Sequence, residues 1–276
     1  MLSPIPVDRA LPGLANVWRA GELGSASLQT LDTGHAALNE VLPGSGWPQG
    51  ALVEVLQPQA GLYEWGLLAP ALAATQAAAP AQRLVLVGAP YLPFGPALGA
   101  RQLDMRRLLC VNAGPANQGK APALLWATRE ALQCADVAGV LAWLPDARSA
   151  HLRRLQIAAQ AHHKLLFVFR PLRAQHESSP APLRLLLEGA VREKGNLLVG
   201  VLKRRGPPLA APVLLDTRPA RLSALLAASQ ERARRKREEL GGGAPLLRPS
   251  PVSLPVTSPQ SPIHALLDRI AHLDHH

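Results

Sequence analysis

Between residues 51 and 170 the sequence alternates short, continuous apolar runs with longer segments of helical periodicity. A strand covered on both faces carries no polar alternation, so such runs are typical of a parallel sheet enclosed by helices. The pattern therefore predicts an α/β fold with a mostly parallel, twisted sheet and helices on both faces. The predicted strands are residues 51–56, 83–89, 106–112, 138–144 and 164–170. The predicted helices are residues 64–79, 95–103, 121–135 and 148–162.

Two further apolar runs complete this core. Residues 182–190 and 196–205 are joined by VREKG, and because no helix separates them they predict an antiparallel hairpin at the sheet edge. Residues 31–50 predict a short helix followed by a Gly/Pro turn, and residues 1–30 an N-terminal segment punctuated by proline and glycine. We expect the core to extend over residues 31–217.

The sequence changes character after the core. Residues 218–240 predict a C-terminal basic helix, and residues 241–262 form a Pro/Gly-rich linker. Residues 263–276 then carry apolar side chains that share one helical face: Ile263, Leu266, Leu267, Ile270 and Leu273. A tethered amphipathic helix cannot bury this face alone, so we expect it to dock into a groove of a partner protein. The alternative is that it folds back onto its own core.

Composition adds a strong positive charge. The chain has 29 Lys and Arg against 19 Asp and Glu, a net charge of +10, which favours nucleic acid or an acidic protein face as partner. A solvated basic surface is the alternative. No apolar stretch is long enough for a membrane span, and the first residues lack the features of a signal peptide, which predicts a cytoplasmic protein. Cys110 and Cys134 form no CxxC pair, and no cluster of ligands predicts a metal site.

Several segments resemble the core of the recombinase RecA, in the same order. TGHAALNEVLPGSGWPQGALVEVLQP (33–58) is similar to the segment that leads into the recombinase phosphate loop. RLVLVGAPYLPFGPALGARQLDMRRLLCVNAG (83–114) is similar to the strand, helix and strand that follow. RRLQIAAQAHHKLLFVFR (153–170) resembles the elements before the second DNA-binding loop, and NLLVGVLKRRGPPLAAP (196–212) resembles a late core strand. The resemblance implies a RecA-like core.

Within that superfamily the chain resembles the ImuA family, the RecA-like proteins of bacterial translesion-synthesis cassettes. The motifs are VWRAGEL (17–23), LPGSGWPQGAL (42–52), LLAPALAA (67–74), AWLP (142–145), LRRLQIAA (152–159) and VLKRRG (201–206). The resemblance implies an accessory role in SOS-induced translesion DNA synthesis. Its implied partners are RecA, an ImuB-type Y-family-like protein and an error-prone replicative-type polymerase subunit. Single-stranded DNA is a further candidate partner, and association with the nucleoid after DNA damage is expected.

The resemblance also implies that ATP chemistry has been lost. A phosphate loop wraps phosphates in backbone N–H groups, reaches them with a lysine ammonium and holds Mg²⁺ with a Ser or Thr hydroxyl. On the recombinase pattern the lysine falls at Tyr63 and the hydroxyl residue at Glu64. The first and last glycines fall at Gln57 and Leu62. The degenerate phosphate loop comprises Gln57, Pro58, Gly61, Leu62, Tyr63 and Glu64.

The other positions that handle ATP in recombinases depart from the pattern as well. The acidic residue at the end of the strand GVLAWLP falls near Trp143, the water-activating glutamate at Pro90, and the nucleotide-sensing glutamine at Arg170. Loss of such groups costs orders of magnitude in rate. We therefore expect no ATPase activity and no cofactor. The alternatives are weak nucleotide binding, an ATP-binding recombinase-like DNA-repair protein, and a SulA-like cell-division inhibitor, to which such chains are also similar.

Basic residues supply the candidate contacts with DNA or a partner. Lys203, Arg204 and Arg205 end a predicted strand, where the resemblance places a Lys-x-Lys pair that reaches nucleotide across a protomer interface. Arg170 and Arg173 lie in the loop that resembles the recombinase DNA-binding loop, which here lacks an aromatic side chain for base stacking. The basic helix contributes Arg234, Arg235, Lys236 and Arg237. The respective alternatives are a solvated strand end, a plain surface loop and an ion-paired helix.

Overall fold

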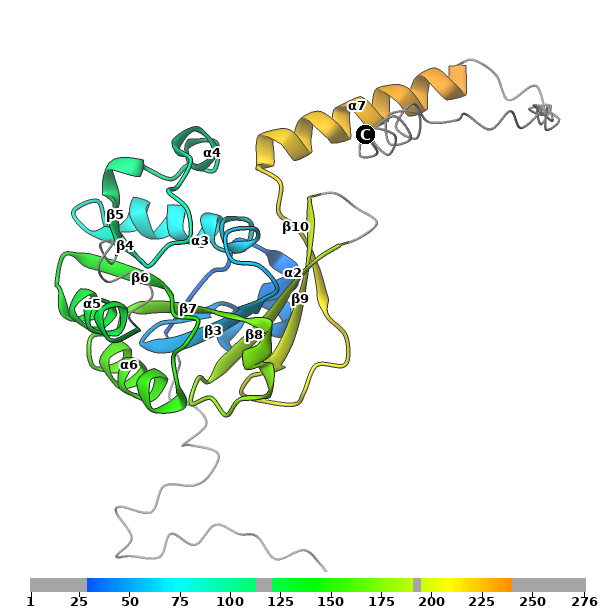
Figure 1. Ribbon diagram of the computed structural model, residues 1–276. Helices are drawn as coiled ribbons and strands as arrows, with labels where there is room; N and C mark the ends of the chain where they lie inside the picture. Colours follow the sequence, from blue (N-terminus) through cyan, green and yellow to red (C-terminus); the bar gives the residue numbers. More distant parts are fainter. Residues whose placement is uncertain (1–28, 113–120, 191–194, 240–276) are drawn as a thin grey trace, which may run out of the picture. The chain divides into compact units, whose positions relative to one another are not determined.

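The protein has an eight-stranded, mostly parallel β-sheet with helices on both faces (Figure 1). The computed structural model describes residues 29–112, 121–190 and 195–239. The strands are β3 (Ala51–Gln57), β4 (Arg83–Val87), β5 (Leu108–Val111), β6 (Val137–Trp143), β7 (Leu165–Pro171), β8 (Leu183–Gly189), β9 (Asn196–Lys203) and β10 (Val213–Asp216). Their order across the sheet is β10-β9-β8-β3-β7-β6-β4-β5. β9 is antiparallel to both neighbours and the other pairs are parallel, so the α/β prediction is confirmed.

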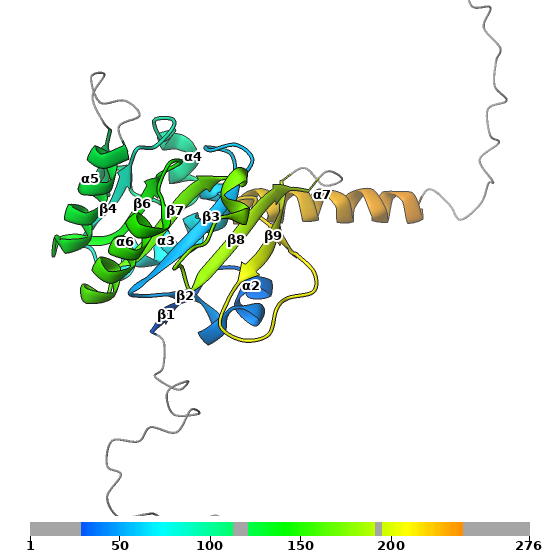
Figure 2. The same ribbon diagram turned by 60° about the horizontal axis from the view of Figure 1, so that its bottom comes forward.

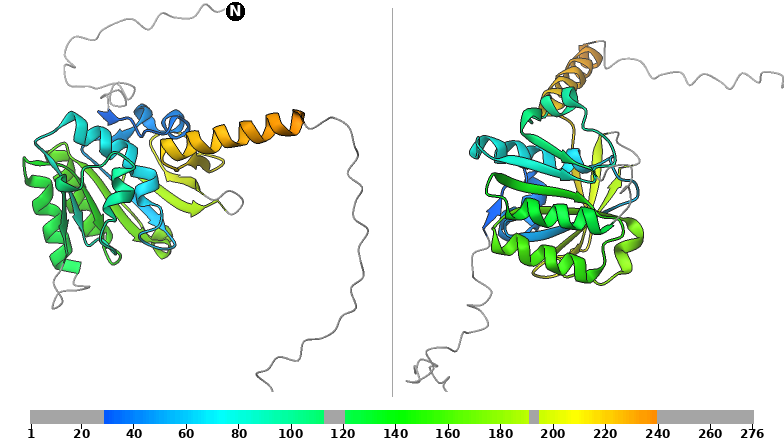
Figure 3. Two further views of the ribbon diagram at one scale, coloured as in Figure 1. Left: turned by 90° about the horizontal axis from the view of Figure 1, so that it is seen from above. Right: turned by 60° about the vertical axis from the view of Figure 1, so that its left-hand side comes forward.

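The helices form a layer on each face of the sheet. They are α2 (Ala36–Val41), α3 (Glu64–Ala78), α4 (Gly95–Gly99), α5 (Ala121–Gln133) and α6 (Ser149–Ala161). Leucines of α2, α3 and α4 join one apolar cluster, and leucines of α5 and α6 join the other. Figures 2 and 3 show α5 and α6 side by side on their face of the sheet. The short strands β1 (Thr30–Leu31) and β2 (Trp47–Pro48) pair with each other before β3 begins.

β3 is the central strand of the sheet next to which the functional residues described below lie. It lies between β7 and β8, parallel to both, and all of its residues are buried. Val53 and Val55 face the cluster under α3, whereas Leu52 faces the cluster under α5 and α6. A strand covered on both faces needs no polar alternation, which explains its continuous apolar pattern. Its carboxyl end leads directly into the loop that precedes α3.

The structure differs from the sequence prediction at three elements. β10 follows the predicted hairpin and takes the edge position, because Leu214 pairs with Leu198 of β9. The helix predicted over residues 95–103 ends at Gly99. β5 starts only at Leu108, because a 3-10 turn precedes it in which the Asp104 side chain accepts a hydrogen bond from the backbone N–H of Arg106 at 3.0 Å. The predicted antiparallel hairpin of β8 and β9 is present, but its position at the edge of the sheet was predicted wrongly, because β10 lies there.

The chain divides into two compact units, residues 1–225 and 226–276, and the division falls within α7 (Ala220–Glu239). α7 agrees with the basic helix predicted for this part of the sequence. From Arg221 to Arg237 its side chains are exposed, apart from a half-buried Ser223. The predicted helix within residues 263–276 and the N-terminal segment up to residue 28 lie outside the described residues.

Candidate functional site

The loop between β3 and α3 is closed by the carboxylate of Glu64. Glu64 is the first residue of α3 and is completely buried. Its Oε1 accepts hydrogen bonds from Gln57 Nε2 at 2.6 Å, Gly61 N at 2.7 Å and Trp143 Nε1 at 2.9 Å. Its Oε2 accepts one from Tyr63 N at 3.0 Å. We call Gln57, Gly61, Tyr63, Glu64 and Trp143 the closed loop site.

The location of this carboxylate follows from local physical chemistry. The first N–H groups of a helix have no partner within the helix, and the helix dipole favours a negative charge there. Gly61 has a φ of 92°, a left-handed conformation that turns the loop and lets its N–H meet Glu64. A loop of this kind is an anion-binding arrangement, and here the anion is the chain's own carboxylate.

The indole of Trp143 is held in place from the neighbouring strands. Trp143 ends β6, and its ring stacks on Phe169 of β7 with centroids 4.7 Å apart and an interplanar angle of 26°. This stacking fixes the direction of the indole N–H toward Glu64. The hydrogen bond joins the end of β6 to the start of α3, which are 79 residues apart in sequence. The closed loop site is therefore a tertiary contact as well as a local cap.

Apolar side chains surround the outer side of this loop. The ring of Tyr91 lies against Gly61, so that a Cβ at position 61 would come within 2.6 Å of the ring. Tyr91 is 65% exposed, and Leu62, Leu92 and Phe94 are also exposed. Large apolar side chains that remain in solvent together mark a surface suited to protein contact.

Two of the predicted loop residues point away from the site. Pro58 and Leu62 are exposed, whereas Gln57 and Glu64 are buried. Tyr63 contributes its backbone N–H, while its phenol oxygen lies close to Gly189 at the end of β8. The resemblance suggested that Trp143 and Glu64 stand where recombinases have other groups, but nothing in the sequence indicated that the two would bind each other. The only available signal was that the resemblance assigns both positions to the same site.

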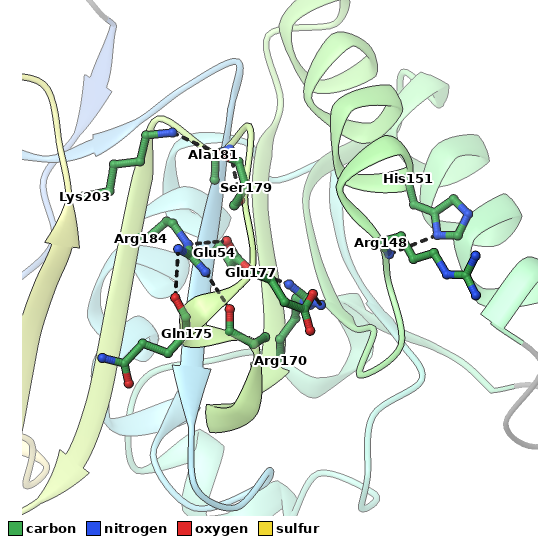
Figure 4. A network of polar contacts seen from close by, with 11 residues as sticks. Glu54, Arg148, His151, Arg170, Gln175, Glu177, Ser179, Ala181, Arg184 and Lys203 are labelled. Carbon is green, nitrogen blue, oxygen red and sulfur yellow. Dashed lines mark hydrogen bonds and ion pairs between the residues drawn. The ribbon is translucent and has the colours of Figure 1, made fainter.

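A buried ion network fixes the segment between β7 and β8 (Figure 4). Glu54 of β3 is completely buried and accepts hydrogen bonds from Arg170 Nη1 at 2.9 Å and Arg184 Nε at 2.7 Å. Arg170 Nη2 also donates to Glu177 at 2.6 Å. Arg184 Nη2 donates to the carbonyl of Ala174 at 2.9 Å. These bonds connect the turn after β7 to the central strand β3.

Arg170, predicted to contact DNA or a partner, is buried in the fold and not on the surface. Its side chain is only 2% exposed and is shared between Glu54 and Glu177. Burial by itself lowers the pKa of Arg170, but the hydrogen bonds to Glu177 and Glu54 outweigh it and raise the pKa above its usual value. The same guanidinium holds the pKa of Glu177 below its usual value. Sequence reasoning missed Glu54 because a lone acid in an apolar strand does not reveal its partners.

Arg173 is the part of this loop that stays accessible. Its side chain is 66% exposed and pairs with the exposed Asp146 at 3.1 Å. Exposed ion pairs contribute little to stability, so Arg173 can exchange Asp146 for another anion at small cost. The structure thus keeps Arg173 as a candidate contact residue.

The cations at the end of β9 bind backbone carbonyls. Lys203 Nζ donates to the carbonyl of Ser179 at 3.0 Å, and Arg204 donates to the carbonyls of Pro207, at 2.9 Å, and Val41. Arg204 and Arg205 line a hollow of about 610 Å³ at the amino-terminal edge of β3. β9 runs antiparallel to β8, so its end lies beside the beginning of β8. The three cations are therefore far along the sheet from the closed loop site, at the opposite ends of the strands.

The cations of α7 are exposed, in agreement with a contact role and equally with a solvated helix. Arg234, Arg235, Lys236 and Arg237 all face solvent. Arg235 Nε lies 3.4 Å from Glu231 Oε1, an i,i+4 pair of the kind that stabilises a helix by a few tenths of a kcal/mol. The predicted ion pairing is thus present for Arg235.

Comparison with known proteins supplies no family for this site: neither the protein-family models nor the curated proteins searched give a match. Among the described residues, no group of three or more His, Cys, Asp or Glu side chains is arranged to hold a metal ion. No helix in the described part of the chain is long and apolar enough to cross a membrane.

Proposed function

We propose that this chain is a non-catalytic accessory protein of SOS-induced translesion DNA synthesis, built on a RecA-like core that no longer uses ATP. It joins RecA to an ImuB-type Y-family-like protein and an error-prone replicative-type polymerase subunit, the partners that the resemblance to the ImuA family implies. The order of strands and helices, a parallel sheet whose β3 leads through a glycine turn into α3, supports the RecA-like part of the proposal.

The observation that carries the proposal is the hydrogen bond from Trp143 to Glu64. The resemblance places these two residues where recombinases hold Mg²⁺, with a loop hydroxyl and an acid at the end of a neighbouring strand. In this chain the two side chains bind each other, which supports the proposal that no metal is held there. On this proposal, a carboxylate that already accepts four hydrogen bonds stands where recombinases hold the metal.

The closed loop site also opposes triphosphate binding electrostatically. Glu64 takes the backbone N–H groups of Gly61 and Tyr63 that would otherwise face a phosphate. An anionic ligand would have to displace a buried carboxylate or lie beside it without a compensating cation, because no lysine stands in the loop. The exposed Tyr91, Leu92 and Phe94 then favour protein contact at this end of the sheet.

The test is a pull-down of the tagged full-length chain from DNA-damaged source cells, with a second bait that ends at Gly243. Capture of RecA and the polymerase partners by the full bait is expected, and loss of the polymerase side alone with the short bait would assign that contact to the tail. Capture of the tubulin-like division protein alone would favour the cell-division inhibitor. ATP turnover clearly above that of a Tyr63→Ala variant would favour the recombinase-like enzyme.

A further inference from the structure

A second site lies at the edge of the sheet opposite the closed loop site. The hollow of about 610 Å³ opens where β3 and β8 begin and where β9 ends. α6 ends beside it, because the chain passes from α6 into β7, whose Leu165 pairs with Ala51 at the start of β3. The volume lies within the range of roughly 300 to 1,000 Å³ that is typical of ligand sites.

The hollow has a positive side without a balancing carboxylate. Arg204 and Arg205 line it, and no Asp or Glu does so among the described residues. Carbonyls of Val41 and Pro207 hold the Arg204 guanidinium in position, whereas Arg205 is exposed. By contrast, Arg173 and Arg218 are paired with nearby aspartates. A guanidinium fixed by carbonyl groups keeps its full charge for an incoming anion.

Four glutamines and four prolines make up most of the remaining lining, among them Gln49, Gln156, Gln160, Pro180 and Pro182. Gln156 Oε1 accepts a hydrogen bond from the N–H of Leu52 at 2.7 Å, which fixes this amide and leaves its NH₂ group as a donor. Glutamine amides both donate and accept, so they match the N–H and C=O groups of a peptide backbone. Proline rings supply rigid apolar walls for an extended chain.

Two features separate a peptide ligand from nucleic acid. No Phe, Tyr or Trp side chain lines the hollow in the described part of the chain, so a base would find only the imidazole of His163 as a stacking surface. The carboxyl-terminal end of α6, which contains Gln160 and is followed by His163, also lies at the hollow. The negative end of its dipole disfavours the many phosphates of a nucleic acid more than the single carboxylate that a peptide would bring.

We propose that this hollow binds a short acidic peptide segment of a partner protein. One carboxylate side chain pairs with Arg204 and Arg205, and the peptide backbone bonds to the glutamine amides. The inference deepens the proposed function and rests on it, because it names the chemistry of one partner contact.

The test uses the full-length chain and a phage-displayed library of random hexapeptides. Wild type, Arg205→Glu and a matched charge reversal on α5, Arg129→Glu, are the three baits; Arg129 is exposed and does not line the hollow. Peptides enriched by wild type are expected to carry Asp or Glu. The best peptide, labelled with fluorescein, should bind Arg205→Glu about tenfold more weakly by anisotropy and Arg129→Glu as wild type does.

Enrichment without acidic residues, or equal binding by Arg205→Glu, would overturn the inference. Competition by the single-stranded DNA dodecathymidylate is a further check. If it displaces the labelled peptide at a lower concentration than the unlabelled peptide does, the hollow is a nucleic-acid site and the inference is overturned. The partner pull-down separates the two proposals. Capture of RecA and the polymerase partners without enrichment of acidic peptides refutes only the peptide-binding proposal for the hollow. Enrichment of acidic peptides without that capture refutes only the proposed function.

Discussion

The indole N–H of Trp143 donates to the carboxylate of Glu64 across 2.9 Å, inside the loop that the RecA resemblance assigns to phosphate. The contact explains how a strand–loop–helix unit can persist without nucleotide. Donors that would otherwise be unsatisfied at the start of α3 are bonded by a side chain of the same helix. The unit is thereby stable as a scaffold, and its surface is available for other contacts.

Replacement of Glu64 by Ala should destabilise the fold by about 2 to 4 kcal/mol, because it leaves the buried donors of Gln57 and Trp143 and two backbone N–H groups without an acceptor. Urea denaturation gives the free energy of unfolding. Addition of acetate should restore part of it to Glu64→Ala and none to wild type, since acetate supplies the missing carboxylate. An unchanged unfolding midpoint in Glu64→Ala would contradict the role of this side chain.

Wild type should neither bind nor hydrolyse ATP. Thermal unfolding in the presence and absence of ATP with Mg²⁺ should give the same midpoint, because a ligand stabilises a protein only if it binds the folded state. Phosphate release should equal that of the Tyr63→Ala variant. A midpoint that rises with ATP concentration in wild type would show that the loop opens, and would count against the proposed function.

The Glu54 network should behave as a single structural unit. Glu54→Ala leaves Arg170 and Arg184 as buried cations and should cost about 3 to 5 kcal/mol of stability. Arg173→Ala breaks only an exposed pair and should cost about 0 to 1 kcal/mol. Urea unfolding of Glu54→Ala, Arg184→Leu and the double variant gives their coupling energy. Additive effects would mean that the pair does not act together.

Stability should fall on mild acidification through His35. Burial lowers the pKa of His35, and Arg101 lowers it further, while the carbonyls of Leu67 and Gly66 and the charge of Asp216 act in the opposite direction. The unfolded chain therefore binds the proton more readily than the folded protein. The free energy contributed by neutral His35 is complete above pH 6.5, the usual pKa, and is lost as the pH falls below it.

The measurement for His35 is the unfolding midpoint in urea at pH 5.5 and pH 7.5. Wild type should lose more stability than His35→Gln between these two values, since Gln does not titrate. An equal loss in both proteins would assign the acid sensitivity to other groups.

The sequence by itself determined the class of fold and the absence of lysine, serine and threonine from residues 57–64. A continuous apolar run such as residues 84–87 can be buried on both sides only between two layers, and the segments of helical periodicity supply those layers. The residue types at positions 57 to 64 were enough to predict that the loop lacks a phosphate-binding lysine and hydroxyl. These conclusions depend only on residue types and their local spacing, which the sequence contains.

Tertiary structure alone decided what the replaced and charged residues do. Glu54, Arg170 and Arg184 meet because β7 and β8 flank β3, and residue types far apart in sequence do not reveal such pairing. Burial leaves the Arg170 side chain only 2% exposed, which argues against the predicted contact with DNA or a partner. The hollow beside Arg204 and Arg205 and the bond between Trp143 and Glu64 likewise arise where distant segments converge. The physical reason is that burial, pairing and cavity shape depend on three-dimensional packing, whereas residue type and periodicity are properties of the sequence.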